Sequence, residues 1–197
     1  MAREITLDVG GRTVGLMAGR GGLKGRPTVL FIHGSGGSSR TWLPQVSPLD
    51  LEIGAGALDL PGRGRTPGPP LIDVNVMGDW VVAAARRLNL EPRPFLAGIS
   101  LGGAAALAAA LQSPETWSGL ILISTGPRLD PLPNLLETLR SDYAAGLTMF
   151  AGLLFGSGVD PGQVNRSRAF LAECPAATLI ADLRSEEHTS ELQSPNT

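Results

Sequence analysis

The chain is poor in the residue types that mark several large classes of protein. Its 197 residues include one cysteine, Cys174, so an internal disulfide framework is excluded. That cysteine lies directly before a proline in a polar-flanked segment, and we expect a packed thiol rather than a nucleophile. Hydrophobic residues make up 43% of the chain, enough for one globular domain with a sizeable core.

Lysine is also scarce, since Lys24 is the single lysine among 16 basic residues and the others are arginines. The formal net charge is −2, and no cluster of basic side chains forms the stripe that nucleic acid binding requires. No apolar run approaches the roughly 18 residues of a membrane span, and residues 1–10 carry charges and glycines where a secretory signal would be apolar. We therefore expect a cytoplasmic protein that binds neither nucleic acid nor a membrane.

Strand-like and helix-like segments alternate over the first two thirds of the chain. A hairpin is predicted for residues 3–18, and an unbroken apolar run at 28–34 indicates a strand buried on both faces. Helical spacing of apolar residues predicts a helix over 72–90, with Asp73 as its N-cap. The further strands are expected at 51–62, 94–99 and 117–125, with a helix over 100–114. This order predicts an α/β fold with a doubly wound, mostly parallel sheet.

The pattern changes after Pro127, where amphipathic helices follow without an intervening strand. We divide the chain into a core at 1–126, a helical lid at 127–183 and a tail at 184–197. The lid carries a strongly apolar group of side chains that either packs the lid onto the sheet or lines a substrate site. These residues are Leu147, Met149, Phe150, Leu153, Leu154 and Phe155.

A serine stands between glycines at the end of the strand predicted for 94–99. Gly98, Gly102 and Gly103 surround Ser100, and an alanine-rich helix begins at once. Such glycines permit a tight strand-to-helix turn that exposes the hydroxyl at a helix N-terminus. The free amides and partial positive charge at that terminus favour an alkoxide and an oxyanion. Ser100 is therefore a candidate nucleophile.

A glycine-rich loop at 34–37 follows the central strand directly, and its amides could point into the same cavity. Phosphate binding is the competing interpretation of such a loop. Neither the G-x-G-x-x-G pattern nor a Walker sequence with its lysine is present, which argues against it. The loop therefore favours an oxyanion hole.

These segments together resemble the α/β-hydrolase superfamily. The matching sequences are HGSGG at 33–37, DLPGRGRT at 59–66 and GISLGG at 98–103, in family order and spacing. The resemblance implies an α/β-hydrolase fold with Ser100 as nucleophile at the nucleophile elbow. It also implies an oxyanion hole formed by the N–H groups of Ser35 and Leu101. His33 and Gly34 open the oxyanion loop, so His33 is implied to be structural.

The activity implied by the resemblance is hydrolysis of an ester, thioester or lactone-type acyl substrate, in the manner of an esterase. The substrate would be a small and apolar molecule, and no cofactor or metal is implied. An acyltransferase or a cofactor-free haloperoxidase of the same fold stays open, as does a ligand-binding protein without catalysis. The oligomeric state is not predicted.

The sequence offers no suitable catalytic base for this interpretation. A serine nucleophile needs an adjacent base, and in these hydrolases the order is Ser, acid, His. His33 precedes Ser100, and His188 lies in a polar segment with no apolar period to anchor it. Asp59, Asp79 and Asp130 are poor candidates for the acid, with Asp130 the best of them. We therefore expect this chain to be inactive.

The tail has an abrupt change of composition. Arg184 to Ser194 reads as the translation of a widely used short-read sequencing adapter, RSEEHTSELQS. A genuine disordered C-terminus is the alternative. We expect the adapter origin, with 184–197 disordered and the chain an amino-terminal fragment of a longer hydrolase truncated after the first part of the lid.

Overall fold

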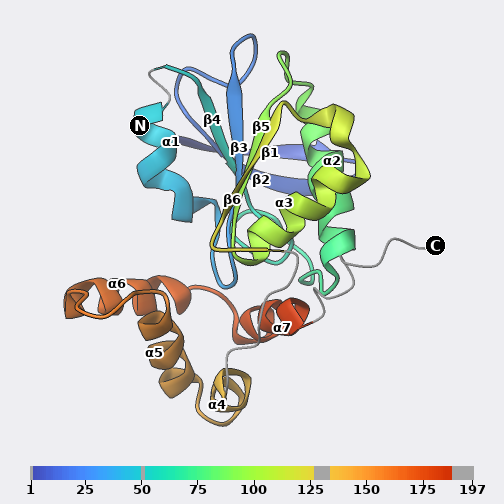
Figure 1. The fold of residues 1–197 in the computed structure, drawn as a ribbon. Helices are drawn as coiled ribbons and strands as arrows, with labels where there is room; N and C mark the ends of the chain where they lie inside the picture. Colours follow the sequence, from blue (N-terminus) through green and yellow to red (C-terminus); the bar gives the residue numbers. More distant parts are fainter. Residues whose placement is uncertain (1, 50–51, 127–133, 188–197) are drawn as a thin grey trace.

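A six-stranded sheet forms the centre of the molecule. The computed structural model describes residues 2–49, 52–126 and 134–187. The strand order is β1-β2-β4-β3-β5-β6, with β1 and β2 antiparallel to their neighbours and the other pairs parallel. The predicted mostly parallel α/β sheet is confirmed (Figure 1). The strands are β1 (Arg3–Val9), β2 (Arg12–Ala18), β3 (Thr28–Ile32), β4 (Gly54–Leu58), β5 (Phe95–Ile99) and β6 (Gly119–Ile123).

Helices cover both faces of this sheet, which is why its central strands are apolar on both sides. The short helix η1 (Ser39–Trp42) and α1 (Leu43–Leu49) pack on one face, where Trp42 and Val46 join the side chains of β3 and β4. The other face is covered by α2 (Val74–Leu88) and α3 (Leu101–Gln112), followed by the short helix η2 (Pro114–Thr116).

The start of α2 agrees with the sequence prediction. The Asp73 carboxylate accepts hydrogen bonds from the backbone N–H groups of Asn75 at 2.7 Å and Val76 at 3.1 Å. These bonds satisfy two amides that have no partner within the helix, as an N-cap requires. Asp73 is therefore the N-cap of α2.

The strand β6 forms an edge of the sheet within the described part of the chain. Its side chains alternate between the two faces, yet Ile121 and Leu122 are both about two fifths exposed, at 42% and 40%. An apolar strand with an open edge and two partly open faces is prone to pair with other strands.

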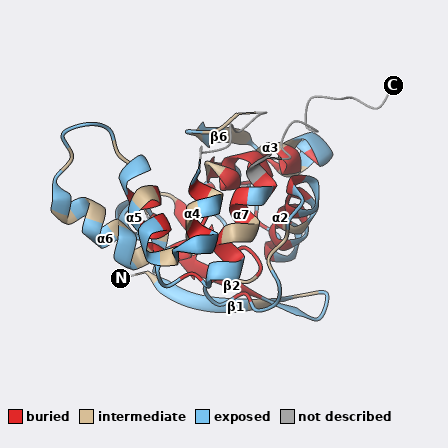
Figure 2. Cartoon of the chain, turned by 90° about the horizontal axis from the view of Figure 1, so that it is seen from below, coloured by how far each residue is buried: buried red, intermediate tan, exposed pale blue. Residues whose placement is uncertain are grey.

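Four further helices form a second layer beyond the carboxyl ends of the parallel strands (Figure 1). They have their own apolar cluster, to which α4, α5 and α7 contribute most of the buried side chains. Figure 2 shows these helices from below, with buried and exposed residues mixed along α4, α5 and α7 and mostly exposed or intermediate residues along α6. They are α4 (Leu135–Ser141), α5 (Tyr143–Leu153), α6 (Pro161–Leu171) and α7 (Ala176–Glu187).

The end of α7 differs from the sequence prediction. We expected disorder from Arg184 onward, but the helix continues to Glu187. Ser185 is buried, and its hydroxyl donates to the carbonyl of Ala181 at 2.9 Å, which adds a local bond to the last turns. Residues 188–197, the remainder of the predicted tail, lie outside the described residues.

Candidate active site

Ser100 lies at the turn between β5 and α3 in a strained backbone conformation. Its φ is +52° and its ψ is −126°, a region that residues with a side chain rarely adopt. The turn is fixed by hydrogen bonds on both sides of the serine. Its N–H donates to Ile123 at 3.0 Å, and its carbonyl accepts from the hydroxyl of Thr125 at 2.9 Å and from the amide of Gly103 at 2.8 Å. The sharp turn predicted from the glycines is therefore present.

The flanking glycines allow backbone segments to meet around this turn. A β-carbon on Gly98 would lie 2.7 Å from the α-carbon of Gly103 and would overlap the carbonyl of Gly102. A β-carbon on Gly103 would collide with the side chain of Thr125. Each position therefore excludes any side chain at all.

The loop that follows β3 approaches Ser100 closely. A β-carbon on Gly34 would lie 3.3 Å from that of Ser100. The next residue, Ser35, is buried. The N–H of Gly36 donates to Asp182 at 2.9 Å, and that of Gly37 donates to the carbonyl of Gly34 at 3.1 Å. The predicted oxyanion residues Ser35 and Leu101 thus sit on two segments that converge on Ser100.

His33 is fully buried, and both of its ring nitrogens have backbone partners. Nδ1 lies 2.9 Å from the carbonyl of Gly34, and Nε2 accepts the N–H of Leu60 at 3.1 Å. Because Nε2 accepts, the proton belongs on Nδ1 and the ring is neutral. Burial, and secondarily the charge of Arg63, lower the pKa of His33 to about 3. Neither nitrogen is available to take a proton from Ser100 in this arrangement.

The buried neutral state of His33 makes stability depend on pH. The folded-state pKa is about 3 against 6.5 in the unfolded chain, so the unfolded chain binds a proton first as the pH falls. This contribution is complete above pH 6.5 and is lost progressively toward pH 3. From this group we expect the free energy of unfolding to fall by about 2 kcal/mol between pH 7 and pH 5.

Urea unfolding at a series of pH values measures this dependence. A His33→Gln variant keeps a donor and an acceptor but does not titrate, so below pH 6 its free energy of unfolding should fall less steeply, by about 1.4 kcal/mol per pH unit. Equal slopes for the two proteins would show that His33 does not carry the effect.

Asp59 heads the second family motif and acts on the backbone. Its carboxylate accepts from the N–H of Ser39 at 2.6 Å and from that of Arg65 at 3.0 Å. Its own carbonyl accepts from the hydroxyl of Thr66 at 2.6 Å, and that hydroxyl accepts from Gly15 at 2.8 Å. These bonds tie the 59–66 loop to the sheet and to η1, so the Asp59 carboxylate is not placed to orient a base.

Of the other acids considered from the sequence, Asp79 is exposed on α2, away from Ser100 at the start of α3. Asp130 lies outside the described residues, as does His188, so the predictions for these two residues stay untested. His33 is the one histidine within the described ranges. The described part of the chain therefore contains no histidine that could activate Ser100.

A cavity of about 510 Å³ opens beside Ser100, between the sheet and the helices α5 and α6. Of the apolar lid residues singled out in the sequence, Phe150, Leu153, Leu154 and Phe155 line it. Leu147 and Met149 instead belong to the apolar cluster of the lid. Phe150 belongs to both the cavity wall and the cluster, so the group packs the lid and also lines a cavity; a role in substrate binding stays a prediction. The rest of the wall comprises Gly34, Ser35, Gly37, Thr41, Ile99, Ser167, Phe170 and Leu171.

Arg63 and Asp182 are buried functional candidates that the sequence did not reveal. Arg63 Nη2 pairs with Asp182 Oδ1, and Arg63 Nε donates to Asp182 Oδ2 at 3.2 Å. Burial lowers the pKa of Arg63 to about 10, which leaves it charged at neutral pH. An acid within the otherwise apolar start of α7 was the available signal, since a buried acid needs a partner.

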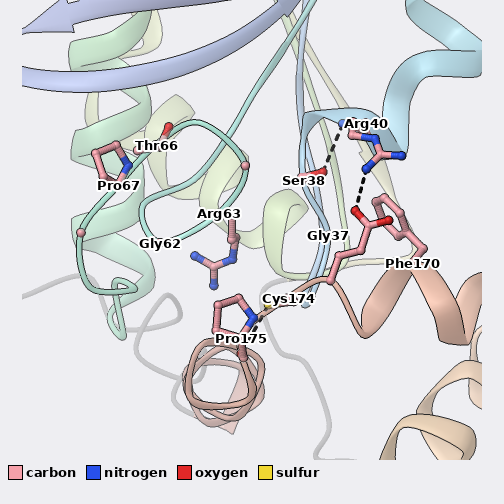
Figure 3. A pocket seen from close by; sticks show the side chains of 14 residues that line it. Gly37, Ser38, Arg40, Gly62, Arg63, Thr66, Pro67, Phe170, Cys174 and Pro175 are labelled. Carbon is pink, nitrogen blue, oxygen red and sulfur yellow. Dashed lines mark hydrogen bonds and ion pairs between the residues drawn. The ribbon is translucent and has the colours of Figure 1, made fainter.

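A second cavity of about 470 Å³ lies between the 34–37 loop with the start of η1, the 62–68 loop and the connection from α6 to α7 (Figure 3). At its rim Arg40 pairs with Glu173 at 2.6 Å. Cys174 lies on its wall and is buried, and burial raises the pKa of its thiol despite the nearby Arg63. The expected packed, unreactive thiol agrees with this environment.

The described residues contain no group of three or more His, Cys, Asp or Glu side chains placed to hold a metal ion. Within the same residues, no helix combines the length and apolar character that a membrane crossing needs.

Comparison with known proteins adds to this geometry. A model of the alpha/beta hydrolase family matches residues 29–193. The pimeloyl-(acyl-carrier protein) methyl ester esterase of Edwardsiella ictaluri is 30% identical over 140 residues, which cover 66% of this chain and 52% of that protein. The dihydrolipoyllysine-residue acetyltransferase component of the acetoin cleaving system of Pseudomonas putida is 32% identical over 145 residues, covering 73% of this chain and 36% of that protein.

A solved structure of a thermophilic esterase superimposes with a TM-score of 0.80 at 26% identity, covering 96% of this chain and 69% of the other. The chain thus matches about half or less of the length of these two curated relatives.

Proposed function

Because the chain belongs to the alpha/beta hydrolase family, we propose that it is a serine hydrolase that cleaves an ester, thioester or lactone-type acyl substrate at Ser100. The observation that carries this proposal is the strained turn that holds Ser100 beside a cavity, next to the oxyanion loop. The esterase names of one relative and one solved structure favour ester substrates. The single buried cysteine is in keeping with a cytoplasmic enzyme.

In the proposed reaction the Oγ atom of Ser100 forms a bond to the carbonyl carbon of the substrate. The carbonyl oxygen becomes an oxyanion, which the N–H groups of Ser35 and Leu101 stabilise. The bond to the leaving group then breaks, and the leaving group departs with a proton. Water hydrolyses the acyl-serine and releases the acid. A base must accept the proton of Ser100, and the described residues include none that is placed to do so.

The cavity favours an uncharged, apolar acyl group. The side chains from α5 and α6 that line it are apolar except for Ser167, and no charged residue is among the lining residues. Burying an unpaired charge in such a site is costly, whereas apolar surface gains from burial. A butyryl ester is therefore a suitable probe.

This chain should hydrolyse p-nitrophenyl butyrate at close to the uncatalysed rate, since the described residues place no base beside Ser100 and loss of the base removes most of the catalysis. Imidazole at high concentration should partly restore turnover, because it can diffuse into the cavity and accept the proton of Ser100. A general base contributes about 10²- to 10⁴-fold, so partial rescue of about tenfold or more is expected. The measurement is the imidazole-dependent rate after subtraction of the rate with Ser100→Ala.

Labelling with a fluorophosphonate in the presence of imidazole identifies the nucleophile directly. The adduct should appear on Ser100 and not on Ser35 or Ser167, which line the same cavity and serve as internal controls. Absence of both labelling and rescue would instead favour a ligand-binding protein without catalysis. Full esterase activity without imidazole would contradict the expected lack of a base.

A further inference from the structure

Asp182 connects the helical layer to the oxyanion loop. It lies on α7 and is fully buried, although it is a carboxylate. Its Oδ2 atom accepts the N–H of Gly36 at 2.9 Å, across 146 positions of sequence. Arg63 neutralises the carboxylate from the other side and also donates from Nη1 to the carbonyl of Pro61 at 2.5 Å.

The orientation of the oxyanion loop depends on two neighbouring peptide planes. The carbonyl of Gly34 and the N–H of Ser35 belong to one planar unit and point in opposite directions. That carbonyl contacts His33 Nδ1 at 2.9 Å and accepts the N–H of Gly37 at 3.1 Å. The next unit contains the N–H of Gly36, which Asp182 holds. His33 therefore fixes the first plane and Asp182 fixes the second.

Packing restricts the loop further at the same point. Gly36 has a φ of +67°, and a β-carbon there would lie 2.8 Å from Leu171 and 3.0 Å from Leu179. The last residue of α6 and the first turn of α7 thus pack against the loop at Gly36, where the carboxylate of Asp182 also binds it. Without that acceptor the buried Gly36 amide would lack a partner, and the loop would rotate to find one.

We propose that Asp182 is a positioning residue for the oxyanion hole: by holding the Gly36 N–H, it fixes the loop so that the N–H of Ser35 faces the carbonyl bound at Ser100. The inference rests on the proposed function of Ser100. Asp182 is not the triad acid, because its two oxygens are engaged by Gly36 and Arg63. We therefore expect the oxyanion hole to form only when α7 packs onto the core.

The test compares two double variants that both remove the buried charges. Arg63→Gln/Asp182→Asn keeps an amide oxygen that can accept from Gly36, whereas Arg63→Gln/Asp182→Leu has none. The readouts are the maximal rate and the half-saturating concentration for fluorophosphonate labelling of Ser100 with imidazole present. Removal of one oxyanion donor costs about 10²- to 10³-fold, so a misplaced donor should lower the maximal rate of the Leu variant by at least about tenfold. Its half-saturating concentration should stay within about twofold, while the Asn variant keeps most of the wild-type rate.

Hydrogen exchange at the Gly36 amide supplies a readout that does not depend on Ser100. It should accelerate in the Leu variant and stay protected in the Asn variant. Circular dichroism and thermal unfolding confirm that each variant is folded. Glu173→Gln is the matched control, because it removes the exposed pair with Arg40 between the same two layers without touching Gly36.

Each outcome decides a different statement. A folded Leu variant that labels Ser100 at the wild-type rate overturns the positioning role alone. An equal loss of rate in Glu173→Gln also overturns it, since any weakening of the contact between layers would then suffice. Wild-type chain that does not label at Ser100 overturns the proposed function, and the positioning role falls with it.

Discussion

Replacing Gly102 with alanine is expected to remove most of the stability of the folded chain. A β-carbon at this position would overlap the carbonyl oxygen of His33 and lie 2.8 Å from its carbonyl carbon. These are backbone atoms of the segment that leads from β3 into the 34–37 loop, and they cannot rotate away as a side chain can. Overpacking a core costs about 1–3 kcal/mol, and a backbone collision should cost at least about 3 kcal/mol.

Denaturant unfolding of Gly102→Ala and wild type measures the difference directly. Gly152→Ala on α5 is the matched control, because nothing lies within 4 Å of a β-carbon there. Alanine is favoured over glycine in a helix by about 1 kcal/mol, so the control should be neutral or slightly stabilising. A free energy of unfolding for Gly102→Ala within about 1 kcal/mol of the wild-type value would contradict the close approach of α3 to the end of β3.

The surroundings of Ser100 could be predicted from sequence because their requirements are local. A strand, a sharp turn and a helix occur within about twenty consecutive residues, and the glycines needed for close approach lie within three positions of the serine. The N-cap Asp73 was predictable for the same reason, since its partners lie two and three residues away. Local rules hold where the partners are neighbours in the chain.

The cavity wall and the buried ion pair depend on contacts between distant segments. Apolar spacing on α5 indicates that the helix is buried, but it does not say which residues face the core of the lid and which face Ser100. Arg63 and Asp182 are separated by 119 positions, and no local pattern links them. The sequence did not predict the end of α7, because residues 184–187 are polar and have no apolar spacing of their own. In the structure the helix that begins at Ala176 continues through them to Glu187.

The Arg63–Asp182 pair leads to the second large effect, a loss of about 3–5 kcal/mol of unfolding free energy in Arg63→Met. The substitution keeps much of the apolar stem of the side chain but leaves the carboxylate of Asp182 buried without a counter-charge. The double variant Arg63→Met/Asp182→Leu removes both charges, so it should recover most of the loss. A double-mutant cycle from denaturant unfolding gives the coupling between the two sites.

Arg40→Met provides the comparison within the same protein. Its pair with Glu173 also joins the core to the helical layer, but both side chains are more than half exposed, and such pairs contribute about 0–1 kcal/mol. A loss in Arg63→Met no larger than in Arg40→Met would show that water reaches Asp182. We expect a much larger loss of unfolding free energy in Arg63→Met than in Arg40→Met. The contact that stabilises the packing of the two layers is then the Arg63–Asp182 pair, and its carboxylate also accepts from Gly36. Loosening of the helical layer would then also break the hydrogen bond that Asp182 accepts from Gly36 in the 34–37 loop.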